Sequence, residues 1–170
     1  MASYFFDTNA LVKAYIYETD GSDWMLGVIS AKSPAHQLFI SEIARVEIPS
    51  SLYKIERARG HAQEITNLAV NRFERHLDAD NGYRHSLYTI LLINDAVLVE
   101  AQRLLRAYRS GTPKGLRSLD ALQLACAIRA RKTLAPEEQP QMVFVTIDKQ
   151  LSGCAANEDF VTFNPTHTSP

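Results

Sequence analysis

Two aspartates stand directly after apolar runs, at positions where an α/β protein could use them for chemistry. Asp7 follows the run Tyr-Phe-Phe, and Asp148 follows Val-Phe-Val-Thr-Ile. Ligands of an open α/β sheet bind beyond the carboxyl ends of its strands. If both runs are parallel strands of one sheet, both carboxylates lie at that edge.

Two further acids could reach the same edge from helices. Asp120 lies in the first turn of a predicted helix whose later part is strongly apolar. Glu47 shares a helical stripe with Ile43, Ser51 and Ile55. Burying a carboxylate on such a stripe is costly unless something neutralises its charge. A divalent cation would neutralise it.

Each of the four acids also has an ordinary structural role open to it. Asp7 and Asp148 could each cap the helix that follows. Asp120 could be favoured by the helix dipole, and Glu47 could reach solvent from the edge of its stripe. None of these roles explains why four acids should meet at one edge, so together the acids favour a shared site.

The chemistry of such a site follows from its ligands. Carboxylates brought together repel one another, and some stay protonated without a counter-charge. Oxygen ligands without cysteine or histidine select Mg²⁺ or Mn²⁺, and such an ion can activate water and neutralise charge on a phosphate. We therefore expect phosphodiester hydrolysis, with metal ligands Asp7, Asp120 and Asp148. Glu47 would hold the attacking water or act as general base.

Composition narrows the class of protein. The 170 residues, 46% of them hydrophobic and 22% charged, fit one globular domain. Two cysteines and five scattered histidines argue against a zinc site. The net charge of −1 argues against an extended nucleic-acid surface. A compact nuclease remains possible, because metal ions can supply positive charge at the reacting phosphate.

Neither a membrane span nor a signal peptide is predicted. Purely apolar runs such as residues 90–93 are short, far too short to cross a membrane. The first residues, MASYFFDTNALVK, lack the basic start and the cleavage site of a signal peptide. We expect a cytoplasmic protein.

Alternating strand and helix patterns predict an α/β fold with a mostly parallel sheet covered on both faces. The expected strands are residues 4–6, 38–40, 88–93, 143–147 and 160–163. The expected helices are residues 8–17, 22–30, 41–59, 61–77, 95–108, 119–131 and 149–156. Residues 1–163 would form a single domain, and residues 164–170 an unstructured tail.

Four segments together resemble one family. FFDTNALVKAYIYE, ISEIARVEIPSSL, LRSLDALQLACAI and VFVTIDKQLSGCAA occur in this order and span nearly the whole chain. They resemble the PIN-domain ribonucleases and, within them, the VapC-type toxins of bacterial toxin–antitoxin pairs. The D-T-N and L-D-A-L-x-L-A pieces are fairly specific in combination and weak singly.

The resemblance implies a three-layer α/β/α fold with a five-stranded parallel sheet. It implies an endonuclease that uses Mg²⁺ or Mn²⁺ to cut RNA and leaves a 5′-phosphate and a 3′-hydroxyl. It also implies a homodimer, and a cognate antitoxin protein whose tail covers the acidic pocket.

The resemblance also assigns residues. It places the family's four catalytic acids at Asp7, Glu47, Asp120 and Asp148. It implies that Asn9 and Thr146 support these acids through hydrogen bonds.

The chain departs from the family pattern at two positions. Pro49 falls in a segment that is usually uninterrupted helix, and it should kink or restart that helix just after Glu47. Glu42, five residues before Glu47, is therefore an alternative to it at the metal. Gln123 stands where many relatives have histidine, and we expect this change to bear little on the acids.

Four basic residues lie near the acids in sequence: Lys13, Arg45, Arg117 and Lys149. They could bind phosphate, although a solvated surface charge is the ordinary role of such residues.

Other classes fit less well. A phosphatase of the haloacid-dehalogenase type would want a second aspartate where Asn9 stands, and the match to a response-regulator receiver is poor. A catalytically inactive binding module of the same fold remains an alternative to the enzyme.

Overall fold

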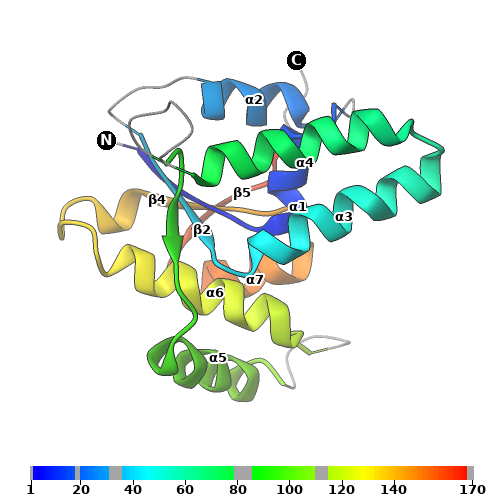
Figure 1. Cartoon of the computed structure of the whole chain (residues 1–170). Helices are drawn as coiled ribbons and strands as arrows, with labels where there is room; N and C mark the ends of the chain where they lie inside the picture. Colours follow the sequence, from blue (N-terminus) through cyan, green and yellow to red (C-terminus); the bar gives the residue numbers. More distant parts are fainter. Residues whose placement is uncertain (1, 18–19, 31–35, 79–85, 110–114, 168–170) are drawn as a thin grey trace.

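A computed structural model describes residues 2–17, 20–30, 36–78, 86–109 and 115–167. Its five strands form one parallel sheet in the order β3-β2-β1-β4-β5 (Figure 1). The strands are β1 Ala2–Phe6, β2 His36–Ser41, β3 Thr89–Leu91, β4 Met142–Val145 and β5 Val161–Phe163. The predicted five-stranded parallel sheet is confirmed.

Helices cover both faces of this sheet (Figure 1). On one side lie α1 Thr8–Leu11, the 3₁₀ helix η1 Val12–Ala14, α2 Ser22–Ser30, α3 Ala44–Arg59 and α4 Gln63–Leu77. On the other lie α5 Asp95–Ala107, α6 Ser118–Arg131 and α7 Lys149–Asn157. Two further 3₁₀ helices are η2 Gln139–Gln141 and η3 Pro165–His167. None of the helices that the structure describes is long and apolar enough to cross a membrane.

The alternation of side chains along β1 builds a separate core on each face. Phe5 packs in the core that contains Leu124 of α6, whereas Phe6 packs in the core that contains Ile48 and Leu52 of α3. Successive side chains of a strand point to opposite faces, so one central strand serves both layers. The expected three-layer α/β/α fold is confirmed.

The strand order fixes where a site can form. From β1 the chain runs outward to β2 and β3, then returns past β1 to β4 and β5. The order therefore reverses between β1 and β4, and ligands of such sheets bind beyond the strand ends at that point. Phe6 pairs with Val145 in the last register of the two strands. The amide of Asp7 then donates to the carbonyl of Val145 at 3.0 Å.

Pro49 does not interrupt α3, so the predicted restart of the helix is wrong. The helix is continuous from Ala44 to Arg59 with Pro49 inside it. Proline removes one backbone donor from a helix. Ile48 and Leu52, on either side of Pro49, are fully buried, and this packing holds both parts of the helix on the sheet.

Two other segments differ from the sequence-based expectation. The first helix becomes a 3₁₀ helix at Val12 and ends at Ala14, instead of continuing to residue 17. Part of the expected tail is ordered, since η3 places a buried Pro165 against Gly21. A Cβ atom at Gly21 would lie 2.9 Å from the Pro165 carbonyl, which only glycine avoids. Residues 168–170 lie outside the described part of the chain.

Candidate active site

Asp7 lies at the base of the candidate site, directly after β1, and is fully buried. Its Oδ2 accepts a hydrogen bond from the Thr146 hydroxyl at 2.8 Å. Its Oδ1 is buried and has no hydrogen-bond partner among the described residues. Asp7 stands at the N-cap of α1, yet its side chain makes no capping bond. The structural role of a helix cap therefore does not account for this carboxylate.

Burial raises the pKa of Asp7 to about 7. The hydrogen bond from Thr146 lowers this pKa, and the charges of Asp120, Glu47 and Asp148 each raise it. The last three effects show that the other acids lie close enough to act on Asp7 electrostatically. The four acids thus share one electrostatic environment, as the strand order predicts.

Thr146 links two of the acids through one hydroxyl group. The hydroxyl donates to Asp7, and it accepts a hydrogen bond from the backbone amide of Asp148 at 3.0 Å. Thr146 is almost fully buried, so this geometry is held by its surroundings. The structure thereby places Thr146 where a supporting residue would be needed.

Asp148 divides its two oxygens between two tasks. Oδ1 accepts from the backbone amides of Gln150 and Leu151, at 2.8 and 3.0 Å, and so caps α7. Oδ2 accepts from Nη2 of Arg117 at 3.0 Å. Asp148 is therefore a helix cap and, through its other oxygen, a member of the acidic cluster.

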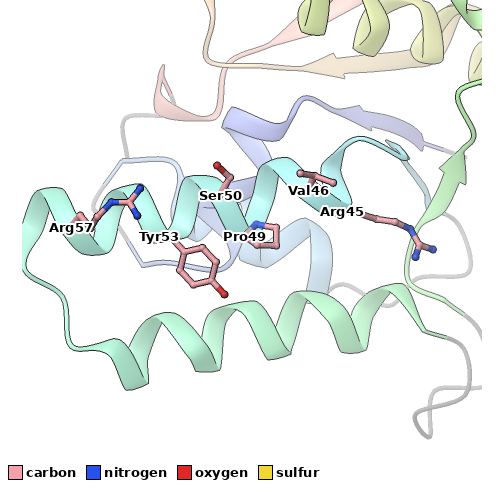
Figure 2. Close-up of a pocket in the computed structure, with 6 residues that line it drawn as sticks. All are labelled: Arg45, Val46, Pro49, Ser50, Tyr53 and Arg57. Carbon is pink, nitrogen blue, oxygen red and sulfur yellow. The ribbon is translucent and has the colours of Figure 1, made fainter.

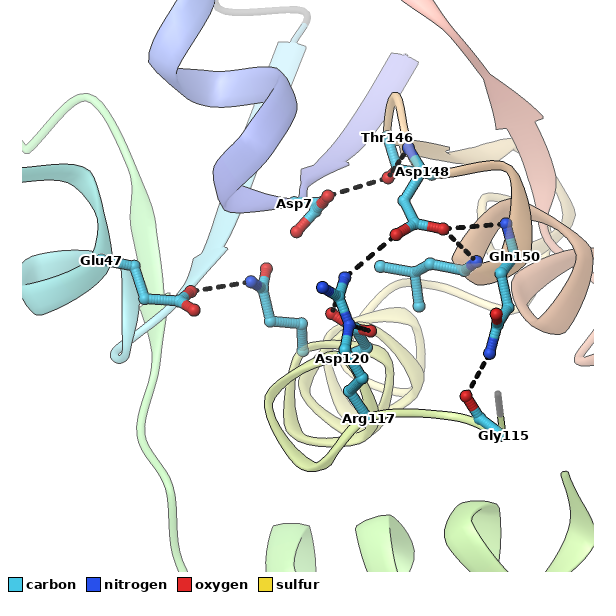
Figure 3. Close-up of polar contacts among 10 residues, drawn as sticks. Asp7, Glu47, Gly115, Arg117, Asp120, Thr146, Asp148 and Gln150 are labelled. Carbon is cyan, nitrogen blue, oxygen red and sulfur yellow. Dashed lines mark hydrogen bonds and ion pairs between the residues drawn. The ribbon is translucent and has the colours of Figure 1, made fainter. Parts of the chain in front are cut away.

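Asp120, in the first turn of α6, is paired with the arginine at the N-cap of that helix. Nε of Arg117 lies 2.7 Å from Oδ2 of Asp120, and Nη2 lies 3.2 Å from Oδ1. The same Nη2 also reaches Asp148, so one guanidinium joins acids from two segments. Figure 3 shows Arg117 between Asp120 and Asp148, with Asp7 and Glu47 facing the same space. The Arg117 side chain is 63% exposed, so this ion pair lies at the surface.

Glu47 projects from α3 and is held by two side chains from other helices. Its Oε2 accepts from the Thr8 hydroxyl at 2.6 Å and from Nε2 of Gln123 at 2.9 Å. Gln123 also accepts a hydrogen bond from the Thr8 amide at 3.2 Å. The expectation that Gln123 bears little on the acids is therefore wrong. The sequence could have predicted that Gln123 lies near the acids. Gln123 follows Asp120 by three residues, and residues three apart on a helix share a face.

Glu42 takes a different position from Glu47. Its Oε2 accepts a hydrogen bond from the backbone amide of Ile93, just after β3, at 3.0 Å. Glu42 does not line the cleft described below, whereas Glu47 does. The structure therefore brings Glu47, and not Glu42, together with Asp7.

Two of the four acids border a cleft of about 500 Å³. Glu47 and Asp120 line it, together with the basic residues Lys54 and Arg117. Asn9 is exposed and also lines the cleft, but none of the hydrogen bonds described joins it to an acid. Glu47 instead accepts a hydrogen bond from Thr8, the residue before Asn9. The sequence-based prediction missed this contact.

The residues present can be tested against a divalent cation. Within the described chain, no three acidic, histidine or cysteine side chains converge as a ready-made metal site. The reason is visible in the contacts, since Arg117 already neutralises Asp120 and Asp148. The unpartnered buried oxygen of Asp7 and the all-carboxylate donor set nevertheless suit a hard cation. The residues fit such an ion once the exposed Arg117 side chain turns away.

Comparison with known proteins places the chain in a family. The PIN domain family model matches residues 4–138. No curated protein sequence shows significant similarity to the chain. The crystal structure of VapBC2 from Rickettsia felis bound to a DNA fragment from their promoter contains a similar fold, with a TM-score of 0.57 and 15% sequence identity. That likeness covers 95% of this chain and 98% of the other. The extent of the family match shows that this chain belongs to the PIN domain family.

Proposed function

We propose that this protein is a metal-dependent endoribonuclease that hydrolyses phosphodiester bonds of RNA at its four-carboxylate site. PIN domains are generally nucleases, which supports the reaction class. The observation that carries the proposal is the buried Asp7, whose Oδ1 lacks a partner among the described residues, at the point where the strand order reverses. An isolated buried carboxylate oxygen is costly unless it has a ligand.

The acids divide into two roles. Asp7, Asp120 and Asp148 would hold Mg²⁺ or Mn²⁺. Such a cation, when bound, supplies a more acidic water and neutralises charge on the scissile phosphate. Glu47 would act as the general base, because Oε2 is fixed by Thr8 while no hydrogen bond is described for Oε1. That oxygen can orient a water molecule and take its proton.

The remaining polar groups position these acids. Thr146 fixes Asp7 and the backbone of Asp148 relative to each other. Gln123 and Thr8 fix Glu47. The guanidinium of Arg117 would leave its two carboxylates when they take a cation. At the mouth of the cleft it could then bind a phosphate of the RNA, for which its planar donors are suited.

We further propose that the protein is the toxin of a toxin–antitoxin pair and acts as a homodimer in the cytoplasm. The sequence resembles the VapC-type toxins, and the similar solved structure is of a complex named VapBC2. The partner would be an antitoxin protein that covers the acidic cleft. Expression of the chain alone should arrest growth, and co-expression with its antitoxin should relieve the arrest. Growth unaffected by an active enzyme would argue against toxin status while leaving the nuclease proposal intact.

The nuclease proposal is tested by incubating the protein with structured and single-stranded RNAs in Mn²⁺, Mg²⁺ or EDTA. An Asp7→Asn variant runs beside it, and sequencing maps the 5′-phosphate ends. We expect cleavage that requires metal and disappears in the variant. Cleavage that survives EDTA or Asp7→Asn would overturn the mechanism.

A catalytically inactive binding module of the same fold is the second candidate. It is favoured by the Arg117 ion pairs, which neutralise Asp120 and Asp148 without a metal. Calorimetric titration with Mn²⁺ separates the two candidates. An enzyme should bind Mn²⁺ and lose this binding in Asp7→Asn, whereas an inactive module should not bind it at the acids.

A further inference from the structure

A second groove, of about 460 Å³, runs along the exposed face of α3 (Figure 2). Six residues line it: Arg45, Val46, Pro49, Ser50, Tyr53 and Arg57. Four of these recur at every fourth position of the helix, and residues four apart share a helical face. The lining is therefore one continuous stripe of α3, which we call the α3 groove.

The α3 groove carries positive charge that nothing in the described chain neutralises. Arg45 and Arg57 lie at its two ends (Figure 2), and both are exposed. Neither forms an ion pair with a carboxylate that the structure describes. Arg103 and Arg117 differ, since each is held by two carboxylates. Two guanidinium groups left open along one groove suit a polyanion.

An aromatic side chain lies between these charges. Tyr53 is 41% exposed, and its ring projects from α3 toward α4 between Arg57 and Pro49 (Figure 2). It takes part in none of the ring contacts described. Proteins bind single-stranded nucleic acid by combining a basic groove with aromatic rings on which bases stack. The α3 groove has both components.

The groove is continuous with the acidic cleft. Val46 and Ser50 line both, on the turn of α3 that also carries Glu47. From Glu47 to Arg57 the helix rises about 15 Å, at about 1.5 Å per residue. A strand whose phosphate lies at the acids would therefore pass along this groove as it leaves the cleft.

We infer that the α3 groove binds single-stranded RNA next to the scissile phosphate. Arg45 and Arg57 would contact phosphates, and Tyr53 would stack on a base. The inference rests on the proposed nuclease function, since it names a subsite of the same enzyme. It also reconciles an RNA substrate with a net charge of −1, because the positive charge is needed only along one short groove.

A protein partner is the competing occupant of this face. Of the exposed apolar residues, Val46 lines the groove, whereas Ile65 and Leu68 belong to α4 and do not line it. The groove itself presents two arginines and a serine beside the apolar Val46, Pro49 and Tyr53, and its only charged groups are positive. This composition favours a nucleic acid over an apolar protein segment.

The test measures binding of a fluorescein-labelled single-stranded RNA by fluorescence anisotropy in EDTA, so that no cleavage occurs. We expect Tyr53→Ala to weaken binding about tenfold, as loss of one stacked base would. Arg45→Gln combined with Arg57→Gln should weaken it by a similar factor. The double variant should also lower the slope of log K against log salt by about 1.4, or about 0.7 per phosphate contact.

Matched controls are available in the same chain. Tyr17→Ala removes another exposed tyrosine, 68% exposed and outside both pockets, and Arg103→Gln removes another exposed arginine. Both should leave RNA binding unchanged, and circular dichroism should show all variants folded. RNA binding that is unchanged in the groove variants would overturn the inference, as would equal losses in the controls.

Hydrolysis of a small diester, bis(p-nitrophenyl) phosphate, with Mn²⁺ separates this inference from the proposed function. The small diester needs the acids but not the groove. Groove variants that hydrolyse it normally but bind RNA weakly would support the inference. If the wild type hydrolyses the diester but the groove variants bind RNA normally, the groove inference is overturned and the nuclease proposal stands. If the wild type hydrolyses neither the diester nor RNA, the nuclease proposal is overturned. Weakened RNA binding in the groove variants would then still support RNA binding at the α3 groove.

Discussion

Two arginines of this protein bridge carboxylates in nearly the same way, yet their surroundings differ. Arg103 of α5 binds Glu100 on its own helix and Glu158 at the end of α7. Arg117 binds Asp120 on α6 and Asp148 at the start of α7. In both cases one partner lies three residues along the chain and the other comes from a distant segment. We call these the Arg103 bridge and the Arg117 bridge.

The two bridges differ in the side chains that lie next to them. Glu158 of the Arg103 bridge also accepts a hydrogen bond from the Tyr108 hydroxyl at 2.8 Å, so the bridge joins α5 and α7. Close to the Arg117 bridge lies Asp7, buried, with a raised pKa and an oxygen that lacks a partner among the described residues. The comparison teaches that an exposed ion pair says little about function until the groups behind it are known.

The largest expected effect comes from removing the acid behind the Arg117 bridge. Asp7→Asn should reduce Mn²⁺-dependent RNA cleavage by about a hundredfold or more, since even groups that only support metal ligands contribute about 10- to 100-fold. Glu158→Gln, which disrupts the Arg103 bridge, should leave the cleavage rate unchanged. Single-turnover rates on one RNA measure both variants. Equal losses would remove the functional distinction between the two bridges.

A second expected effect is a dependence of stability on pH, which should be largest in the absence of metal. The pKa of Asp7 is raised to about 7 from an ordinary value of 3.8, so between these pH values the folded protein holds a proton that the unfolded chain has released. The free energy of unfolding should therefore fall as pH rises through this range and level off above it. Each pKa unit corresponds to about 1.4 kcal/mol, which predicts a loss of about 4 kcal/mol.

Denaturant unfolding in EDTA at pH 4 to 8 measures this effect as a difference between proteins. Asp7→Asn should lack the Asp7 contribution, so the stability of wild type minus that of the variant should fall as pH rises. Glu158→Gln should keep the wild-type pH dependence. A difference between wild type and Asp7→Asn that stays constant across this range would show that Asp7 titrates normally.

A third expected effect separates the bridges by their competition with metal. Arg117→Gln frees Asp120 and Asp148 from their guanidinium, so Mn²⁺ should bind about tenfold more tightly, the typical size of a change in one neighbouring group. Arg103→Gln should leave the Mn²⁺ affinity unchanged. Isothermal titration calorimetry at constant ionic strength gives both values. Weaker Mn²⁺ binding in Arg117→Gln would mean that the arginine helps to build the metal site.

The smallest expected effect is on stability, where the two bridges should behave alike. The Arg103 side chain is 47% exposed and that of Arg117 63% exposed. Exposed pairs of this kind contribute about 0.2–1 kcal/mol. Arg103→Gln and Arg117→Gln should each lower the free energy of unfolding by at most about 1 kcal/mol, and less in 1 M NaCl. A larger loss in only one variant would show that its bridge supports the fold.

The sequence predicted the position of the central acids because local order determines it. Asp7 follows a buried strand and Asp148 follows another, and parallel strands bring such residues to one edge. The choice between Glu42 and Glu47 could not be made in this way. It depends on α3 beginning at Ala44, after a turn, which sets the direction of each side chain.

Contacts between distant segments could not be predicted from the sequence. Arg117 precedes Asp120 by three residues, so that pair could be anticipated. Its bond to Asp148, 31 residues away, depends on how α6 and α7 pack. The bond from Gln123 to Glu47 joins residues 76 apart for the same reason. Tertiary packing, which local spacing does not encode, decided both.

The strand order has a consequence for dividing the protein into fragments. Asp7 and Glu47 come from the part of the chain that builds β1, β2 and α3, and Asp120 and Asp148 come from the part that builds α6 and β4. A chain split between α4 and β3 would leave two acids in each fragment. Neither fragment alone could supply the full set of carboxylates, so fragment complementation would restore the cleft only when both halves assemble into one sheet.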